Sequence, residues 1–320
     1  MKSRPRIIVI GSLVFDFVAR ASRIPKEGET ILGDMFGMFP GGKGANQAVQ
    51  AGRLGAEVFM VGRVGVDFLG DQLLTSLGEA EVSTDFVTRD ASVKTAACCI
   101  HVSALGQNSI IIVPEANMAC TENDVDAALD VIRSADIVLC QLEIPLATVS
   151  YAAQLAARNQ VTFILNPAPA QQLPDELLRL VSYLTPNETE AEQLSGVAII
   201  QEADSRQGYH PTVSRAGNRL LSRGPMSVII TLAERGAYYA GRDREAHYKA
   251  FPVKAVDTTA AGDAFNGALA VALGEGRGVD EAIRFANAAG ALATTRAGAQ
   301  PSMATREEIE GLLRTGPIST

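Results

Sequence analysis

Short runs of β-branched and aliphatic residues alternate with amphipathic segments along most of the chain. The clearest apolar runs are Ile7–Ile10, Val58–Val61, Ile137–Cys140, Val161–Leu165 and Val228–Leu232. Segments with the apolar spacing of helices lie between them, as in Thr148–Ala157 and Pro174–Leu180. Continuous apolar strands separated by amphipathic helices are typical of βαβ units. The pattern therefore predicts an α/β protein with a mostly parallel sheet and helices on both of its faces.

A stretch rich in small residues predicts one further helix near the start of the chain. Gly44–Leu54 brings Ala45, Ala48 and Val49 onto one face at helical spacing, and Gly55 follows as a helix stop.

Three segments break the alternation. Thr95–Val102 and Ser109–Val113 are β-rich and are joined by a polar turn, which predicts a hairpin, and Glu29–Phe39 is also strand-like. We interpret them as antiparallel pieces outside the main sheet, which form either a lid or an ordinary edge hairpin. Gln201–Arg215 is polar and contains Gly and Pro, so we expect a loop or short insertion there.

Composition limits the class of protein. The 320 residues are 47% hydrophobic and 20% charged, which predicts a globular protein with either one large α/β domain or two smaller ones. Because 28 basic and 36 acidic residues give a formal charge of −8, we expect neither nucleic acid nor a membrane surface as partner.

Targeting signals and cysteines predict a cytoplasmic protein. The apolar stretch from Ile7 is too short to span a membrane, and it runs into Asp16 without the cleavage site of a signal peptide. The four cysteines form no C-x-x-C pair, so we expect buried free thiols in a reducing compartment.

Pro40–Asn46 is the first candidate for chemistry. Its Gly-Gly-Lys-Gly core nearly matches a P-loop, but Gly44 stands where a P-loop carries the hydroxyl that holds Mg²⁺. What remains is a glycine-rich helix start with exposed N–H groups, Lys43 and Asn46. It suits either a polyol or anion, or close packing.

Val256–Gly267 is the second candidate. A strand-like segment ends near Val256, and a helix of small residues follows the turn formed by Ala260, Ala261 and Gly262. Such a turn leaves amides free for an anion at the positive end of the helix dipole. Asp263, in the first helical turn, is either a simple helix stabiliser or a base aimed at an attacking hydroxyl.

Two polar turns follow predicted strands further along. In Thr185–Glu192, Asn187 is a good N-cap and Glu190 lies three residues later, so this pair forms a capping box or faces Mg²⁺ through water. Thr231–Gly236 is a tight turn at which backbone could meet phosphates. Ligands of parallel α/β sheets bind beyond the carboxyl ends of the strands, where all these turns lie.

Taken in order, these segments resemble the ribokinase group within the phosphofructokinase-B type of carbohydrate kinases. The resemblance covers nearly the whole chain and is strongest in the Gly41–Ala48 and Asp257–Gly267 motifs. Further matches are Gln141–Glu143, Asn166–Ala170, Thr185–Glu192 and Gly298–Ser302. It implies a ribokinase-like three-layer α/β/α fold over residues 1–320, with a small β-sheet lid formed by about 13–40 and 95–113.

The resemblance also implies an activity, ATP-dependent phosphorylation of a sugar hydroxyl, for this group the 5-hydroxyl of ribose. It assigns Asp263 as the base, with the amides of Ala260, Ala261 and Gly262 stabilising charge on the transferred phosphoryl group. The implied sugar-binding positions are Val14, Asp16, Gly42, Lys43, Asn46, Glu143 and Asp263. The implied nucleotide-binding positions are Asn187, Thr231, Leu232, Ala233, Glu234, Arg235, Gly236, Gly262 and Asn287.

Metal ions and a partner follow from the same resemblance. Glu190 falls on the residue that organises Mg²⁺ through water. The implied ligands of an activating monovalent cation, usually K⁺, are Asp257, Thr259, Ala293, Arg296, Gly298 and Ser302. In this family the lid closes over the sugar and commonly forms a homodimer interface.

Two departures from the family pattern bear on specificity. Val14 stands where ribokinases usually carry an Asn that contacts ribose hydroxyls, which makes 2-deoxyribose or another sugar more plausible as substrate. A nucleoside or a hexose is a further alternative. Ala233 stands where the family usually has Gly, so we expect the nucleotide turn to differ slightly while ATP binding survives. A non-catalytic sensor is disfavoured because Asp263 and Gly262 are both present.

Overall fold

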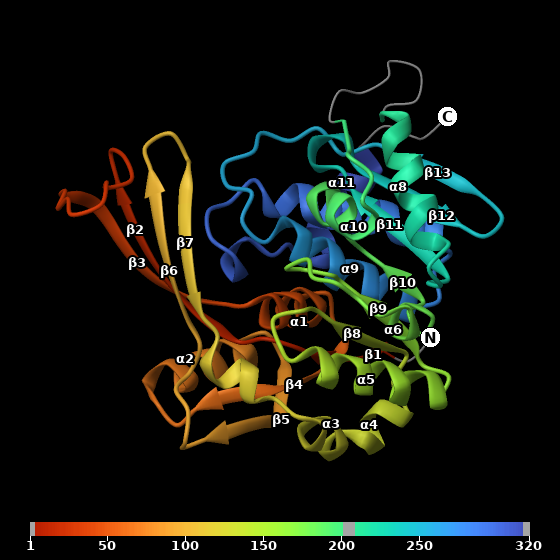
Figure 1. Cartoon of the computed structure of the whole chain (residues 1–320), viewed down its shortest axis with the longest axis horizontal. Helices are drawn as coiled ribbons and strands as arrows, with labels where there is room; N and C mark the ends of the chain where they lie inside the picture. Colours follow the sequence, from red (N-terminus) through yellow and green to blue (C-terminus); the bar gives the residue numbers. More distant parts are fainter. Residues whose placement is uncertain (1–3, 201–208, 316–320) are drawn as a thin grey trace.

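The central feature of the computed structural model, which describes residues 4–200 and 209–315, is a nine-stranded sheet (Figure 1). Its seven strands from β11 to β5 are parallel, and β12 and β13 join antiparallel at one edge. Across the sheet the strands are β13 (Glu245–Tyr248), β12 (Ala237–Gly241), β11 (Ser227–Thr231), β10 (Tyr183–Leu184), β9 (Thr162–Leu165), β8 (Ile137–Cys140), β1 (Arg6–Ile10), β4 (Glu57–Gly65) and β5 (Val82–Asp90). The predicted mostly parallel sheet is confirmed.

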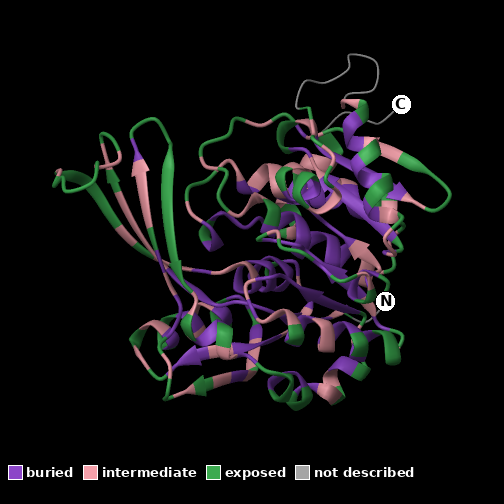
Figure 2. Cartoon of the chain, in the orientation of Figure 1, coloured by how far each residue is buried: buried purple, intermediate pink, exposed green. Residues whose placement is uncertain are grey.

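Helices cover both faces of this sheet, because successive side chains of each strand point to opposite sides. In β1, Ile7 and Val9 enter one apolar core and Ile8 and Ile10 enter the other, and all four are fully buried (Figure 2). The first core includes residues of α1 (Lys43–Arg53), α2 (Phe68–Glu79), α9 (Ala261–Gly274), α10 (Val279–Ala293) and α11 (Arg306–Thr315). The second includes residues of α3 (Glu122–Ala127), α4 (Leu129–Arg133), α5 (Leu146–Arg158), α6 (Asp175–Leu178), α7 (Glu188–Ser195) and α8 (Pro211–Leu221). The three-layer α/β/α prediction is confirmed.

A second sheet of four strands projects from the body, at the left of Figure 1. Its order is β3 (Gly33–Gly41), β2 (Val14–Ala21), β6 (Ala97–Ser103) and β7 (Asn108–Val113). The predicted hairpin is β6 and β7. The strand predicted from Glu29 begins only at Gly33, where pairing with β2 starts, and runs on to Gly41.

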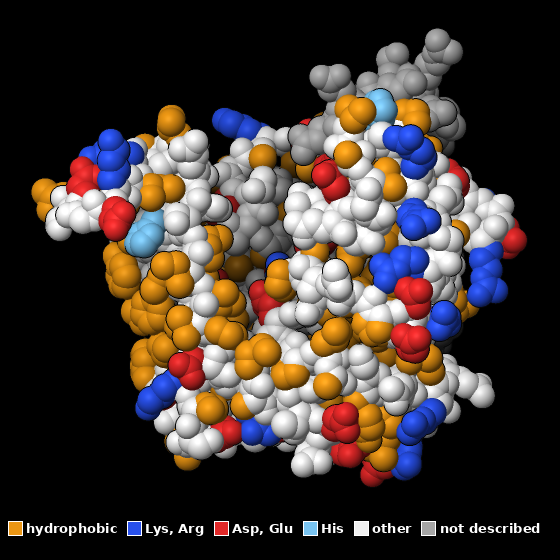
Figure 3. All heavy atoms as spheres, viewed as in Figure 1, with side chains coloured by type: hydrophobic (Ala, Val, Ile, Leu, Met, Phe, Trp, Pro, Cys, Tyr) orange, Lys and Arg blue, Asp and Glu red, His pale blue; other side chains and the backbone are white. Residues whose placement is uncertain are grey.

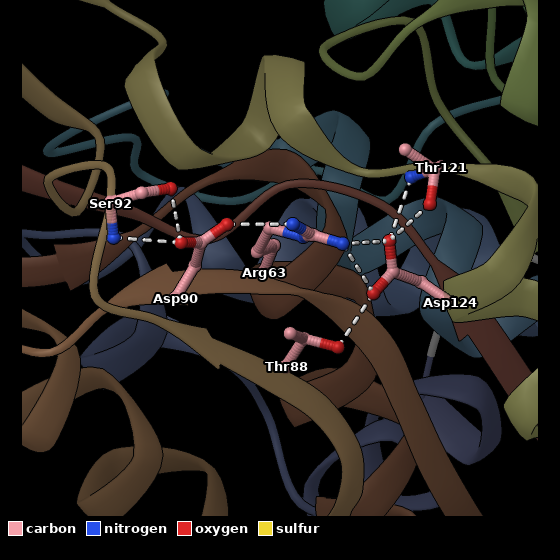
Figure 4. Close-up of polar contacts among 6 residues, drawn as sticks. All are labelled: Arg63, Thr88, Asp90, Ser92, Thr121 and Asp124. Atoms are coloured by element: carbon pink, nitrogen blue, oxygen red, sulfur yellow. Dashed lines mark hydrogen bonds and ion pairs between the residues drawn. The ribbon is translucent and has the colours of Figure 1, made fainter.

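An ionic cluster anchors the segments that lead into and out of this second sheet (Figure 4). Arg63 of β4 donates to Asp90, at the end of β5, with 2.7 Å between Nη1 and Oδ2, and to Asp124 of α3 with 2.7 Å between Nη2 and Oδ2. Asp90 also accepts from the backbone and hydroxyl of Ser92, and Asp124 accepts from Thr121. One guanidinium therefore holds the chain just before β6 and just after β7.

Two predicted features differ from the structure. The segment before Val256 is not a strand; the N–H of Val256 instead donates to the carbonyl of Thr294. Within the expected loop Gln201–Arg215, residues 201–208 lie outside the described part, and Pro211 begins α8, with the His210 side chain accepting from the Thr212 N–H. Pro is favoured in the first turn of a helix, where no intrahelical N–H bond is lost.

Three short 3₁₀ helices complete the described elements, which are η1 (Glu115–Ala119), η2 (Ala233–Arg235) and η3 (Gln300–Ser302). In residues 4–200 and 209–315, no helix combines the length and apolar character that a membrane crossing would need.

Candidate active site

The beginning of α9 forms the centre of the candidate site. Ala260 precedes the helix in the left-handed conformation, with φ of 58°, and Asp263 lies in the first turn with 7% of its surface exposed. A Cβ added to Gly262 would meet no atom within 4 Å, so open space lies in front of this turn. The Ala261 N–H already donates to the Thr258 carbonyl at 3.3 Å. Gly262 and Asp263 therefore supply first-turn N–H groups, for which the helix itself contains no acceptor carbonyl.

Helix α1 packs against α9 and brings polar side chains to Asp263. Gly267 permits this contact, because a Cβ there would lie 2.6 Å from the Gln47 carbonyl oxygen. Asn46 Nδ2 donates to Asp263 Oδ2 at 3.0 Å, and Gln47 Nε2 donates to Asp263 Oδ1 at 2.9 Å. Both carboxylate oxygens are thus held by neutral donors, and the Oδ1 atom of Asn46 is buried without a hydrogen-bond partner.

Three further carboxylates and one lysine lie around Asp263. Burial, followed by the charges of Glu143 and Asp263, raises the pKa of Asp16 to about 7. Burial alone would lower the pKa of Lys43, but the carboxylates of Asp263, Glu143 and Glu190 outweigh it and raise that pKa above its ordinary value. Lys43 therefore stays charged within a cluster of acidic groups.

The start of α1 is held by hydrogen bonds to Ser12, in the loop before β2, and to Glu143, after β8. Ser12 Oγ donates to Glu143 Oε2, and the N–H groups of Lys43 and Gly44 donate to Glu143 and Ser12 respectively. Gly42 has a φ of 89°, and a Cβ there would lie 2.6 Å from the Val14 nitrogen. Glycine is therefore required at position 42.

Val14 lies on the same face of β2 as Asp16, since the two are separated by one residue. Its side chain is 2% exposed and packs with Ala96 and Cys98, with Ile100 against them. Val14, which departs from the family pattern, therefore lies on the face of the second sheet that carries Asp16.

The turn after β11 adopts the geometry that a glycine would favour. Ala233 has a φ of 51°, so the left-handed conformation is present despite the Cβ, and the expectation that this position would depart from glycine-like geometry is not supported. Gly236 has a φ of 93°, and a Cβ there would overlap the Tyr248 carbonyl oxygen. Arg235 forms an ion pair with Glu188 of α7. Leu232 is fully buried, and Glu234 is exposed.

Asn187 and Glu190 form the predicted capping box at the start of α7. Asn187 Oδ1 accepts from the Glu190 N–H at 2.8 Å, and Glu190 Oε2 accepts from the Asn187 N–H at 2.8 Å. Asn187 also pairs with Thr231 in an isolated bridge, which joins this turn to the turn after β11. Burial raises the pKa of Glu190; the Asn187 N–H and Lys43 oppose that shift, and Asp263 adds to it.

Asn287 of α10 lies beside the same turn. Its Nδ2 atom donates to the Tyr248 carbonyl at 3.2 Å, the oxygen that closely faces Gly236. The structure therefore brings together the nucleotide positions Asn187, Thr231, Gly236 and Asn287 that the sequence resemblance assigns.

The positions assigned to a monovalent cation lie in two adjoining segments, the loop before α9 and the stretch from the end of α10 to η3. Asp257 accepts from the N–H and hydroxyl of Thr259 and from the Gly298 N–H, while its own N–H donates to Thr294, the residue after Ala293. The Arg296 side chain pairs with Glu308, and Ser302 donates to the Ala299 carbonyl. Among the described residues, no cluster of three His, Cys, Asp or Glu side chains forms a metal site.

These groups together can deprotonate a hydroxyl next to an anion site. Asp263 supplies a fixed carboxylate, the α9 turn supplies amides, and α1 and β2 supply polar groups for a substrate with several hydroxyls. Figure 3 shows the surface hollowed between the second sheet and the body.

Comparison with known proteins identifies the family. The family model described as "pfkB family carbohydrate kinase" matches residues 4–306. The chain belongs to the pfkB family of carbohydrate kinases. Among its relatives in this family is a ribokinase of Bacillus subtilis (strain 168), 43% identical over 96% of this chain and 99% of the relative. A deoxyribokinase of Salmonella typhi is 33% identical over 96% of this chain and 98% of the relative.

A solved pfkB-type relative has the same fold. The structure of Arabidopsis thaliana ribokinase complexed with ribose and ATP aligns with a TM-score of 0.90 and 34% identity, covering 98% of this chain and 99% of that one. This chain is therefore a ribokinase-like carbohydrate kinase.

Gln47 is the site residue to which sequence reasoning gave no role. Gln47 lies within the Gly41–Ala48 motif, so the motif gives the residue type but not its role. Its partner Asp263 is 216 positions away, and residue spacing carries no information about such a contact.

Proposed function

We propose that this kinase transfers the γ-phosphoryl group of ATP to the 5-hydroxyl of D-ribose, giving D-ribose 5-phosphate and ADP. The observation that carries the proposal is the buried carboxylate of Asp263 at the open N-terminal turn of α9, beside the sugar positions of α1 and β2. The relatives named ribokinase and the solved complex with ribose and ATP support ribose as the sugar.

In the proposed reaction, Asp263 removes the proton of the 5-hydroxyl as its oxygen bonds to the γ-phosphorus. The bond between that phosphorus and the bridging oxygen of ATP breaks, and ADP leaves with that oxygen. The amides at Gly262 and Asp263, together with the α9 dipole, stabilise negative charge on the transferred group. Ala260 and Ala261 shape the turn that presents these amides.

Polar groups around the hollow orient the sugar in this proposal. Asp16 and Glu143 accept hydrogen bonds from sugar hydroxyls, and Lys43 and the backbone at Gly42 donate. The unpartnered Oδ1 of Asn46 is an acceptor for one more hydroxyl. Asn46 is buried, and Asp16, Lys43 and Glu143 are half-buried. This placement supports recognition by hydrogen bonds, because an unmatched polar group would be costly there.

The turn Thr231–Gly236, with Asn187 and Asn287, binds the nucleotide. Glu190 suits Mg²⁺ held through water, because a carboxylate oxygen is a hard ligand and Mg²⁺ usually retains several waters. Mg²⁺ would neutralise charge on the phosphates. The carboxylate of Asp257 and carbonyls of the adjoining 293–302 loop are oxygen donors suited to K⁺.

The four-stranded sheet is a lid over the sugar and, in a homodimer, the surface covered by a second copy. On its outer face Phe36 is 66% and Ile111 is 62% exposed, and Met38 and Val113 are also exposed. Exposed apolar side chains gathered on one sheet face support association. The free cysteines support a reducing cytoplasm as the compartment.

A second candidate substrate, 2-deoxyribose, is favoured by one observation. Val14 places an apolar, buried side chain on the strand face of Asp16, at the position where ribokinases usually present an Asn. The deoxyribokinase relative shows that the family includes this activity.

A coupled assay of ADP release over a panel of pentoses, hexoses and nucleosides, with Mg-ATP and K⁺, tests the proposal. We expect the highest kcat/KM with ribose, followed by 2-deoxyribose. A higher kcat/KM for 2-deoxyribose would assign that sugar instead, and no turnover on any member of the panel would overturn the proposed kinase activity.

A further inference from the structure

A chain of buried hydrogen bonds runs beneath the start of α9 and connects both ends of the candidate catalytic turn. Gln47 Nε2 donates to Asp263 Oδ1 and also to Asn166 Oδ1, at 2.9 and 3.1 Å. Asn166 Nδ2 donates to the Thr185 carbonyl at 2.9 Å, and Thr185 Oγ1 donates to Asn266 Oδ1 at 2.6 Å.

The chain returns to the turn where it began. Asn266 Nδ2 donates to the Gly262 carbonyl at 2.8 Å, and Gly262 is the residue before Asp263. The Asp263 carboxylate and the peptide group between Gly262 and Asp263 are therefore fixed by one set of side chains. Those side chains come from α1, α9 and the segments that follow β9 and β10.

The direction of every bond in this chain is determined. Backbone carbonyls only accept, so the amide nitrogens of Asn166 and Asn266 must face Thr185 and Gly262. The Asn166 oxygen then faces Gln47, which must present its NH₂ group. Both hydrogens of that group are used, and Gln47 Oε1 accepts from Gln141 Nε2 at 2.7 Å.

None of the side chains that link Asp263 to Gly262 is titratable, and each is at most 7% exposed. Gln47 itself is fully buried, so its hydrogen bonds do not compete with water. It presents Asp263 Oδ1 with a donor that cannot turn into an acceptor without breaking two other bonds. Asp263 is thereby held as an acceptor at a fixed rotation, as a general base requires.

We propose that Gln47 is a positioning residue for phosphoryl transfer, which acts through the chain Gln47–Asn166–Thr185–Asn266. This chain fixes the rotation of the Asp263 carboxylate relative to the anion-binding peptide of Gly262. The proposal rests on the function proposed above, because it takes Asp263 as the base. It assigns Gln47 an effect on the chemical step and none on the binding of sugar or nucleotide.

The substitution Gln47→Met tests the proposal, because Met has a similar length and fills the space without donating. We expect kcat to fall about 10- to 100-fold, as for a misplaced catalytic group, with the KM values for sugar and Mg-ATP within about twofold of wild type. The assay uses the full chain and the sugar of the panel that it turns over fastest.

Gln50→Met is the matched control. Gln50 lies one helical turn further along α1, is also fully buried, and forms two hydrogen bonds with the backbone of Ala304 instead of the site. It should lose comparable thermal stability while kcat stays within about twofold, because its partners lie outside the chain to Asp263. Equal losses of kcat in the two variants would overturn the proposal.

Thr185→Val provides an independent second variant if Gln47→Met does not fold. It removes the hydroxyl that donates to Asn266, and we expect kcat to fall about 3- to 10-fold with unchanged KM values. Where both variants fold, the double variant should lose little more kcat than Gln47→Met alone, because residues of one network are not additive. An unchanged kcat in either single variant, or a loss confined to KM, would overturn the proposal.

Failure of the inference and failure of the proposed function give different results. If the wild-type chain is active and Asp263→Asn is not, but Gln47→Met keeps its kcat, only the positioning role is wrong. If Asp263→Asn retains wild-type kcat, the base assignment is wrong and the positioning role is wrong with it.

Discussion

Asn46 and Asp263 are 217 positions apart in the chain, yet Asn46 Nδ2 lies 3.0 Å from Asp263 Oδ2. The contact depends on the close approach of α1 to α9 at Gly267. It joins the glycine-rich motif before α1 to the motif that begins α9. The motif proposed to bind the sugar and the proposed base are thereby parts of one hydrogen-bonded unit.

Replacing the proposed base tests this unit directly. Asp263→Asn keeps the size of the side chain but removes the carboxylate that accepts the proton, so we expect kcat to fall about 10²- to 10⁴-fold. Initial rates at saturating sugar and Mg-ATP measure the loss, and circular dichroism checks the fold. Asp130→Asn, on the exposed surface, is the control and should leave kcat unchanged. A near-normal rate for Asp263→Asn would remove Asp263 from the role of base.

We expect the side chain at position 14 to affect discrimination at the 2-hydroxyl of the sugar. Val14→Asn introduces an amide on the strand face of Asp16, and we expect the ratio of kcat/KM for ribose to that for 2-deoxyribose to rise about 10-fold. Val14→Ala, which loses the same apolar contacts without adding an amide, should leave that ratio within about threefold. An unchanged ratio in Val14→Asn would mean that Val14 does not face that hydroxyl.

Sugar binding should depend on pH through Asp16. Its pKa is raised from 3.8 to about 7, first by burial, so below pH 7 the side chain is increasingly protonated and accepts hydroxyl hydrogens less well. We expect the KM for the sugar to rise as the pH falls from 8 to 5.5, by at most about tenfold per pH unit. KM values measured across this range for wild type and Asp16→Asn provide the check, because the variant should show a higher KM without that slope.

Protonation of Asp16, which should weaken sugar binding, should stabilise the fold. Because the folded-state pKa lies above the ordinary value, Asp16 stabilises the fold below pH 3.8, and this contribution is lost as the pH rises through about 7. Asp16→Asn should therefore gain stability relative to wild type between pH 5 and 8 in urea unfolding. A constant difference across that range would contradict the raised pKa.

Ala233 carries backbone strain that a glycine would relieve. Its φ of 51° is left-handed, which costs an L-residue roughly 1–2 kcal/mol. Glycine would relieve this strain but would also increase the conformational entropy of the unfolded chain. We therefore expect Ala233→Gly to raise the free energy of unfolding by a net amount of about 0.5–1 kcal/mol. Ala157→Gly, at an exposed position of α5, should lower it by a similar amount. A loss of stability in both variants would argue against strain at Ala233.

Local chemistry predicted the central strands and the capping box of α7, because both depend on residues close in sequence. The irregular segment before Val256 was missed because its alternation of apolar and polar residues imitates a strand, although its N–H groups bond to the end of α10. The sequence does not predict helix α8, because a polar segment with Gly and Pro indicates a loop, whereas Pro211 occupies the first turn of the helix. The Gln47 chain joins four distant segments, and no local pattern contains it.

The Arg63 cluster offers a test of how the second sheet is anchored. The Arg63 side chain is 17% exposed and forms an ion pair with Asp124, whose side chain is 4% exposed. The substitution Arg63→Met therefore leaves a buried carboxylate without its cation. We expect the free energy of unfolding to fall by about 3–5 kcal/mol, as for the loss of one partner of a buried pair. Arg89→Met, which breaks the exposed pair with Asp71, is the control and should cost no more than about 1 kcal/mol. Urea unfolding of both variants measures the difference, and equal losses would mean that Arg63 contributes no more than a surface ion pair.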